Sequence, residues 1–290
     1  MNVTNKLSLP EPLYAAVTTA PYSRGESDIS ATALIDSPRK VALEEKYSHL
    51  LGEDISQMGA MIGGNAFHAY VKGTGELDDA LRLTMKVNGW VVSGQTDHVT
   101  GDHIIDYKTC RVAKYMRGLT KGHEDWEAQL NIYAELLRSN GYEVNKLSIC
   151  AWLKDWSIEN AGYDNGYPES DIVMIDIPLW PVSKAQDYII TRVLLHQEAR
   201  QSLPLCSPDE LWGEDTWAVM RPGAKRASKV EKTEQDAQGW IDSKREAGDA
   251  TEYWVEYRQG EPRRCRFYCN VGKAGLCDQY EQAKLNEGVA

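Results

Sequence analysis

The sequence lacks any long hydrophobic segment. No stretch of its 290 residues approaches the run of about 18 apolar residues that a membrane-spanning helix needs. The N-terminus lacks the basic segment followed by an apolar block that marks a signal peptide. We therefore expect a soluble globular protein with no membrane partner, located in the cytoplasm of a bacterium or a phage-infected cell. Internal repeats and low-complexity segments are also absent from the sequence.

Positive charge is scarce. The chain has 32 Lys and Arg against 43 Asp and Glu, a formal net charge of −11. Because non-specific affinity for nucleic acid comes largely from basic side chains, this balance excludes a protein that binds nucleic acid over its whole surface. It does not exclude a local basic track. Residues 107–122 contain no acidic residue, and we expect DNA to contact four of their basic side chains: Arg111, Lys114, Arg117 and Lys121.

A second basic cluster lies between residues 221 and 232. Taken alone, such a run is interpreted as ordinary solvated surface. The cluster consists of Arg221, Lys225, Arg226, Lys229 and Lys232.

Cysteine is absent before Cys110, whereas Cys265, Cys269 and Cys277 lie close together near the C-terminus. In a chain without an export signal, clustered cysteines indicate metal or cluster ligation before disulfides. With Cys206 as a candidate fourth ligand, these thiolates could hold either a zinc ion or a four-iron (4Fe-4S) cluster. The alternative is reduced, partly buried thiols. The two remaining cysteines, Cys110 and Cys150, lie in apolar strand-like segments and are expected in the core.

Hydrophobic periodicity predicts an α/β fold, with a mixed central β-sheet flanked by helices in residues 1–203. Helices are expected over 29–35, with Ser30 as N-cap and a stop at Pro38, and over 61–72, 124–138 and 183–200. Strands are expected over 81–99, 103–109, 146–153 and 172–177. Residues 204–290, richer in Pro, Gly, charge and Trp, are interpreted as a small Cys-containing appendage packed on the core.

The turn at residues 101–102 places two acidic residues opposite each other. If Gly101 and Asp102 form a two-residue hairpin loop, Asp97 pairs with Asp106, because paired residue numbers then sum to 203. Their Cβ atoms would lie about 4.5–5.5 Å apart. Lys108 follows on the same face of the strand, while Tyr107 points to the other face.

Two opposed carboxylates repel each other, and a divalent cation such as Mg²⁺ or Mn²⁺ offsets that repulsion. The ammonium of Lys108 could then assist an attacking water and stabilise charge growing on a phosphate. This pattern predicts a metal-dependent phosphodiesterase site. The alternative is that Asp97 and Asp106 are solvent-facing residues of an ordinary amphipathic hairpin.

The segments 94–99 (GQTDHV) and 104–109 (IIDYKT) resemble the central motif of the PD-(D/E)XK nuclease superfamily, in its RecB-like branch. That branch also has an upstream His, matched by His68, and a helical Gln-x-x-x-Tyr motif, matched by Gln129 and Tyr133. The resemblance covers roughly residues 30 to 155 and implies a restriction-endonuclease-like core. It implies a role for each matched residue: metal binding by His68, Asp97, Asp106 and the backbone carbonyl of Tyr107, catalysis by Lys108, and shaping of the site and substrate contact by Gln129 and Tyr133.

The cysteine-containing tail is similar to that of iron–sulfur nucleases of the same branch, including CRISPR-associated exonucleases. In those proteins an N-terminal cysteine, usually before a proline, completes the cluster. Here Ser37-Pro38 occupies that place, and the Cys265–Cys269 spacing is one residue wider than usual. Cys206 is therefore the expected replacement. The resemblance also implies a function in phage recombination or DNA processing, with a single-strand annealing or recombination protein as a possible partner.

The sequence thus favours a Mg²⁺- or Mn²⁺-dependent deoxyribonuclease, most simply an exonuclease acting at DNA ends. Three alternatives stay open. The chain could be an endonuclease, a DNA-binding or assembly protein that keeps the fold without cleaving, or a structural zinc protein. The intact set of Asp97, Asp106 and Lys108 argues against the non-cleaving protein.

Overall fold

The computed structural model describes residues 2–19, 25–72, 82–161 and 166–287. The chain divides into two compact units, the first made of Met1–Val41 and Gly52–Ser202 and the second of Ala42–Leu51 and Leu203–Ala290. The predicted boundary after residue 203 lies one residue beyond the division at Ser202. The prediction nevertheless assigned residues 42–51 to the core, which is wrong. They belong to the second unit because Leu43 and Leu51 pack in its cysteine-containing cluster.

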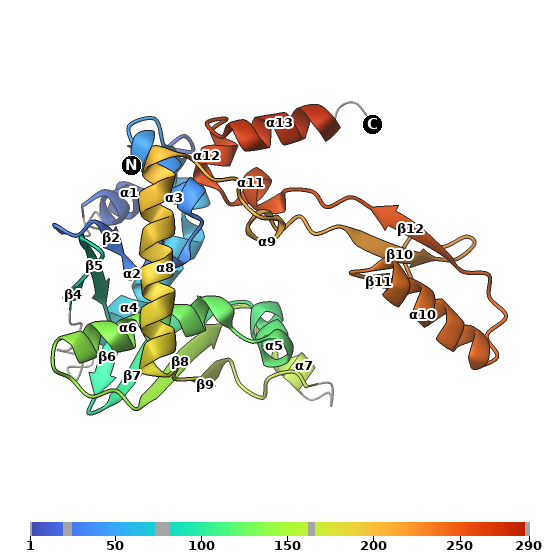
Figure 1. Ribbon diagram of the computed structural model, residues 1–290, viewed down its shortest axis with the longest axis horizontal. Helices are drawn as coiled ribbons and strands as arrows, with labels where there is room; N and C mark the ends of the chain where they lie inside the picture. Colours follow the sequence, from blue (N-terminus) through green and yellow to red (C-terminus); the bar gives the residue numbers. More distant parts are fainter. Residues whose placement is uncertain (1, 20–24, 73–81, 162–165, 288–290) are drawn as a thin grey trace. The chain divides into compact units, whose positions relative to one another are not determined.

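The first unit is built around a four-stranded mixed sheet, as predicted (Figure 1). Its order is β6 (His98–Thr100), β7 (His103–Cys110), β8 (Lys146–Leu153) and β9 (Ile172–Ile177). Strands β7 and β8 are parallel, and the two outer pairs are antiparallel. A three-stranded sheet has the order β2 (Ile29–Ser30), β5 (Trp90–Gln95) and β4 (Arg82–Val87), and β1 (Asn2–Thr4) pairs with β3 (Gly52–Asp54).

The main helices of this unit are α2 (Ala31–Ile35), α4 (Gly59–Lys72), α5 (Val112–Lys121), α6 (Glu124–Ser139) and α8 (Val182–Gln201). Shorter helical segments are α1 (Glu11–Thr18), η1 (Ile55–Gln57) and α7 (Ile158–Ala161), and α3 (Pro38–Lys46) runs from the first unit into the second. The predicted cap at Ser30 is confirmed, since its side chain accepts a hydrogen bond from the Ala33 N–H at 3.2 Å.

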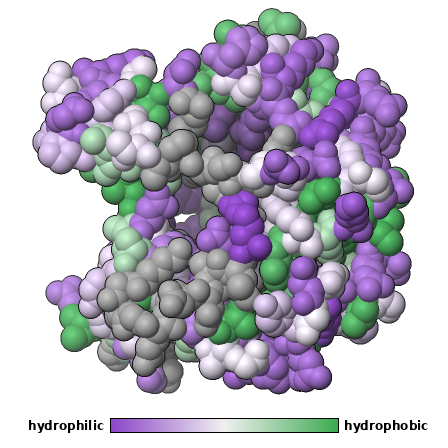
Figure 2. All heavy atoms as spheres, turned by 90° about the vertical axis from the view of Figure 1, so that its left-hand side faces the viewer, coloured by the Kyte–Doolittle hydropathy of each residue, from purple (hydrophilic) through white to green (hydrophobic). Residues whose placement is uncertain are grey.

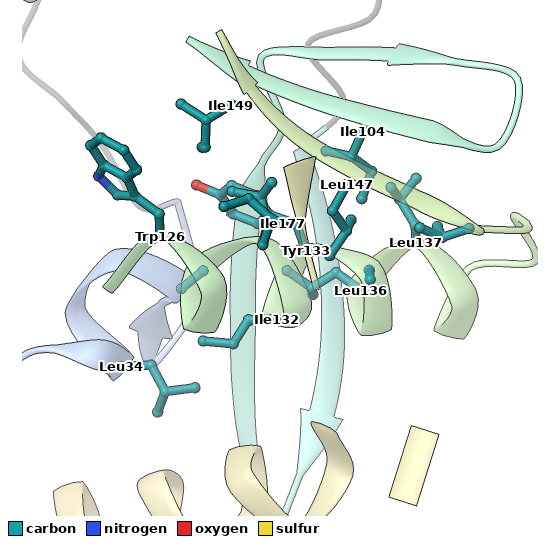
Figure 3. Close-up of a cluster of buried hydrophobic side chains, with 14 of the residues drawn as sticks. Leu34, Ile104, Trp126, Ile132, Tyr133, Leu136, Leu137, Leu147, Ile149 and Ile177 are labelled. Atoms are coloured by element: carbon teal, nitrogen blue, oxygen red, sulfur yellow. The ribbon is translucent and has the colours of Figure 1, made fainter. Parts of the chain in front are cut away.

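Helix α6 forms the centre of the first unit's core. Nearly every residue from Trp126 to Leu137 is buried. Ile104, Leu147 and Ile149 of the sheet lie in the same hydrophobic cluster (Figure 3). Acidic residues in the first turn of α6 and Arg138 in its last turn suit the helix dipole. The helix is therefore held firmly under the strands that carry the candidate site.

One predicted strand differs from the structure, and one helix next to the candidate site was not expected. The single strand expected over 81–99 is a hairpin of β4 and β5, in which Asn88 and Gly89 both have positive φ (47° and 81°), as a two-residue primed turn requires. Residue 81 lies outside the described residues. The short helix expected before Pro38 is confirmed, since α2 ends at Ile35, and Pro38 itself begins α3, because the first helical turn tolerates proline. Helix α5 was not predicted at all.

The second unit contains a small sheet and a group of short helices. The sheet has the order β11 (Lys229–Glu231), β10 (Thr216–Met220) and β12 (Trp254–Arg258), all antiparallel. Helix α10 (Glu234–Glu246) covers one face of it through Ala237 and Ile241, which pack on Val219. The short helices are α9 (Pro208–Leu211), α11 (Arg263–Phe267), α12 (Asn270–Lys273) and α13 (Asp278–Glu287).

The surface is largely hydrophilic. On the face drawn in Figure 2, hydrophobic residues form separate spots among hydrophilic ones. Among the helices that the structure describes, none combines the length and the apolar character needed to cross a membrane.

Candidate active site

The β6–β7 hairpin sets the geometry of the candidate site. Its loop is Gly101-Asp102, and a positive φ of 59° at Gly101 fits a turn with glycine at the first central position. Thr100 pairs with His103 and His98 with Ile105, so paired residue numbers sum to 203 as expected. Continued by one residue, this register places Asp97 opposite Asp106.

Asp97 lies in a gap between two strands. Strand β5 ends at Gln95 and β6 begins at His98, so Asp97 is outside the ladder. Its Oδ2 accepts a hydrogen bond from the Tyr107 N–H at 2.9 Å, and its Oδ1 lies 3.4 Å from Nδ1 of His68 on α4. The N–H and C=O of one residue face the same side of a strand. The Tyr107 carbonyl therefore points toward Asp97, where the predicted ligand would need it.

Asp106 is a buried carboxylate with a charge that the protein only partly balances. Its side chain is 3% exposed, and its Oδ2 lies 2.7 Å from Nζ of Lys108. The pKa of Asp106 is raised to about 6, chiefly by burial and also by the charge of Asp97, and Lys108 offsets part of this rise. The two carboxylates are thus close enough to oppose each other's ionisation, which is the repulsion expected from the sequence.

Helix α6 contributes the Gln129 and Tyr133 pair. Gln129 Nε2 donates a hydrogen bond to the Tyr133 hydroxyl at 2.8 Å, one turn away on the same face. Burial raises the pKa of Tyr133, and the charges of Asp106 and Asp97 add to this effect. The phenol therefore stays protonated beside the carboxylates. The structure brings His68, Asp97, Asp106, Lys108, Gln129 and Tyr133 into one connected neighbourhood.

The donor set at this site fits a hard divalent cation. Two carboxylates, an imidazole and a backbone carbonyl are ligands that Mg²⁺ or Mn²⁺ accepts, and a cation would relieve the repulsion between Asp97 and Asp106. As they stand, no three His, Cys, Asp or Glu side chains in the described ranges are grouped closely enough to hold a metal. Instead, Asp97 binds the Tyr107 N–H and Asp106 contacts Lys108, so metal binding requires these contacts to rearrange.

The predicted DNA track is the helix α5. Arg111 is its N-cap, and Arg111, Arg117 and Lys121 are exposed. Lys114 differs, because its Nζ forms an ion pair with Asp125 at 2.6 Å and lies over the ring of Trp126. Three of the four expected DNA contacts are therefore accessible, and Lys114 is engaged within the protein.

The start of α5 depends on a residue that sequence reasoning missed. Asp155 Oδ1 accepts a hydrogen bond from the Val112 N–H at 2.8 Å, which anchors the helix directly after β7. An acidic residue just after a strand was the only local signal, and nothing in the sequence indicated that its partner lies 43 residues earlier.

The four cysteines proposed as ligands lie in the second unit. Cys265, Cys269 and Cys277 are buried together, and Gln279 holds Cys206 by hydrogen bonds to its N–H (2.9 Å) and carbonyl (3.0 Å). Burial raises the pKa of Cys265 to about 12, and neighbouring thiol charges on Cys269, Cys206 and Cys277 add to the shift. All six cysteines are thiols, with Cys110 buried and Cys150 half-buried in the first unit. The four cysteines thus belong to one neighbourhood, but no three of these described side chains are arranged closely enough to hold a metal ion.

Comparison with known proteins adds no relative. No protein-family model and no curated protein matches this chain. The interpretation of the site therefore depends on the chemistry and placement of its own residues.

Proposed function

We propose that this chain is a metal-dependent deoxyribonuclease that hydrolyses phosphodiester bonds. The observation that carries the proposal is the proximity of Asp97 to the buried carboxylate of Asp106, whose pKa it raises, with the Lys108 ammonium 2.7 Å from Asp106. A bound Mg²⁺ or Mn²⁺ would supply Lewis-acid activation of water and neutralisation of phosphate charge. The restriction-endonuclease-like class and the RecB-like branch are supported by the sequence motifs alone.

We assign each residue of the site a role from its position. Asp97 and Asp106 hold the cation, with His68 and the Tyr107 carbonyl as further ligands. The side chain of Lys108 is 24% exposed, so its ammonium can reach both Asp106 and a phosphate in solvent. There it orients the attacking water and stabilises negative charge on the phosphate oxygens. Gln129 and Tyr133 are buried beside the carboxylates, so their proposed role is to shape the site with a protonated hydroxyl.

Helix α5 is the proposed contact with the DNA backbone. It follows β7 directly, so its basic residues lie beyond the strand that carries Lys108. Arg111, Arg117 and Lys121 would neutralise phosphates and set the register of the strand, without reading its sequence. An exonuclease acting at DNA ends in phage recombination, with an annealing or recombination protein as partner, is the most economical mode, and it follows from the resemblance.

The test is a cleavage assay on end-labelled linear DNA and on circular DNA, with Mn²⁺ or with chelator. We expect degradation of the linear DNA in Mn²⁺ and none in chelator. Asp106→Asn and Lys108→Ala should each reduce the rate by about 10²-fold or more, the scale of losing one electrostatic contact in the transition state. Asp176→Asn, an exposed carboxylate on β9, is the matched control and should cleave normally.

Two other outcomes would change the proposal. Binding of DNA without cleavage by the unmodified protein would favour the non-cleaving DNA-binding alternative. Cleavage of the circular DNA would favour an endonuclease and would overturn the exonucleolytic mode while keeping the metal site.

The grouped thiols of Cys206, Cys265, Cys269 and Cys277 are proposed to hold a structural metal, either zinc or a four-iron cluster. A structural role is proposed because phosphodiester hydrolysis needs no redox partner. The ion would tie together short helices that have few buried residues of their own.

A further inference from the structure

A second concentration of positive charge lies on the loop that joins β10 to β11 in the second unit. Residues 221–232 contain five basic residues and one acidic residue, Glu231. Lys229 and Lys232 are engaged in ion pairs with Glu231 and Glu214. Arg221, Lys225 and Arg226 are exposed, and within the described ranges none of these three forms a salt bridge. We refer to these three residues as the basic loop.

An exposed indole lies next to the basic loop. Trp254, the first residue of β12, pairs with Met220, the residue that precedes Arg221. Val219 and Val255 pack with α10, so the alternation of the strands directs Trp254 to the opposite face of the sheet. Trp254 is 44% exposed. An aromatic ring with this exposure is accessible for stacking on a flat ligand group.

The two loops at this end of the sheet enclose a shallow hollow of about 370 Å³. Arg221, Gly223 and Ala224 line it from one side, and Thr251 and Glu252 from the other. Gly223 has a φ of 73°, which an L-residue rarely adopts, so the turn after Pro222 holds the basic loop in a defined shape. Glu252 lines the hollow, and Glu256 lies on the same face of β12 as Trp254, where it forms an ion pair with Arg258. With the three residues of the basic loop, the balance of charge on this surface stays positive.

We infer that the basic loop and Trp254 form a binding surface for single-stranded DNA, distinct from the site on β7. Unpaired strands are bound where basic side chains meet the phosphates and an aromatic ring stacks on a base. Both features are present here within one strand pair. An acidic peptide would match the positive charge of the basic loop but would not require the exposed indole of Trp254. The inference goes beyond the cleavage activity and does not depend on it.

The test measures binding of a labelled 20-nucleotide single strand to the full chain by fluorescence anisotropy. The protein carries Asp106→Asn and is measured without added Mg²⁺ or Mn²⁺, so no DNA is cut. Changing Arg221, Lys225 and Arg226 to Ala should weaken binding at least tenfold and make the salt slope shallower by about 2, since each phosphate contact on a single strand contributes about 0.7. Trp254→Ala should weaken binding about fivefold or more at an unchanged slope, and Trp254→Phe should retain most of the affinity.

The matched control changes Lys6, Lys146 and Lys284 to Ala, which removes the same charge elsewhere. An equal loss in this control, or no loss in the basic-loop variant, would overturn the inference. Equal weakening on duplex DNA together with no effect of Trp254→Ala would also overturn it, because the surface would then read only backbone charge. A failure of the cleavage proposal appears in the Mn²⁺ assay and leaves these binding results unaffected.

Discussion

At the residue scale, Asp106 is the group whose charge fits its surroundings least. It is buried beside Asp97, and burial raises its pKa to about 6, above the ordinary value of 3.8. The folded protein therefore binds this proton more tightly than the unfolded chain does. Stability contributed by the protonated form is lost as the pH rises from about 4 through 6, and the deficit persists at higher pH.

The raised pKa of Asp106 can be tested by measuring the stability of the metal-free protein. Asp106→Asn should be more stable than the unmodified chain at pH 8 by on the order of 2 kcal/mol, because the amide removes a buried charge that has a raised pKa. The difference should vanish below about pH 4. Urea unfolding in chelator measures both. Added Mn²⁺ should then stabilise the unmodified chain and not the variant. Equal stabilities of the unmodified chain and Asp106→Asn at pH 8 would show that the buried charge of Asp106 does not destabilise the protein.

At the element scale, the site depends on the close approach of α6 to β5. A Cβ atom added at Gly94 would lie 2.5 Å from Leu136 Cδ1 and 2.8 Å from Tyr133 Cε1. Glycine at this position therefore lets the helix that carries Gln129 and Tyr133 lie against the strand that leads to Asp97.

Gly94→Ala should destabilise the protein by about 1–3 kcal/mol through overpacking and should slow cleavage, because Tyr133 must move. Gly63→Ala on α4 is the control, since no atom lies within 4 Å of its added Cβ. That change should be neutral or stabilising by up to about 1 kcal/mol. Denaturant unfolding of both variants measures the difference. A neutral Gly94→Ala would mean that α6 does not limit the geometry of the site.

The elements that local pattern controls could be predicted from the sequence. The Gly101-Asp102 turn determines the register of the β6–β7 hairpin by itself, so its pairing could be predicted. Helix α6 could be predicted because it combines an apolar period with a suitable stop. The Asn88-Gly89 turn carried an equally strong signal and was overlooked within a long β-like run. Helix α5 was missed because its basic residues dominate a segment in which only Val112 and Gly118 are buried.

Contacts between distant segments could not be predicted. The cap that Asp155 provides to α5 joins residues far apart in the sequence, and no local period reports it. The same holds for the break between β5 and β6. The residue types at Thr96 and Asp97 suit a continuous strand, yet β5 ends at Gln95 and β6 begins at His98. The proximity of His68 to Asp97 was expected from the family resemblance alone.

At the scale of the whole molecule, the chain is two units, and the second is discontinuous in sequence. Residues 42–51 leave the first unit in the middle of α3 and supply Leu43 and Leu51 to the cluster around the cysteines. The sequence indicated the C-terminal part of this unit by its change in composition. It carried no sign of the short N-terminal insertion, which is defined only by packing.

The second unit should contain its own metal. The protein purified without oxygen should carry either zinc or iron, and Cys265→Ser should lose it, because that thiol is buried among the other three. Cys150→Ser, a half-buried thiol of the first unit, is the control and should keep the metal. Elemental analysis with an absorbance spectrum measures the content. Absence of both metals from the unmodified protein would leave the cysteines as plain buried thiols.

The most direct test of the account is a Mn²⁺ titration of the chelator-treated full chain, followed by electron paramagnetic resonance of the free ion. We expect saturable binding by the unmodified protein, and affinity at least tenfold weaker in Asp97→Asn and in Asp106→Asn, with Asp176→Asn unchanged. Binding that is equal in all four proteins, or absent from all of them, would contradict the claim that the two opposed carboxylates form a divalent-cation site.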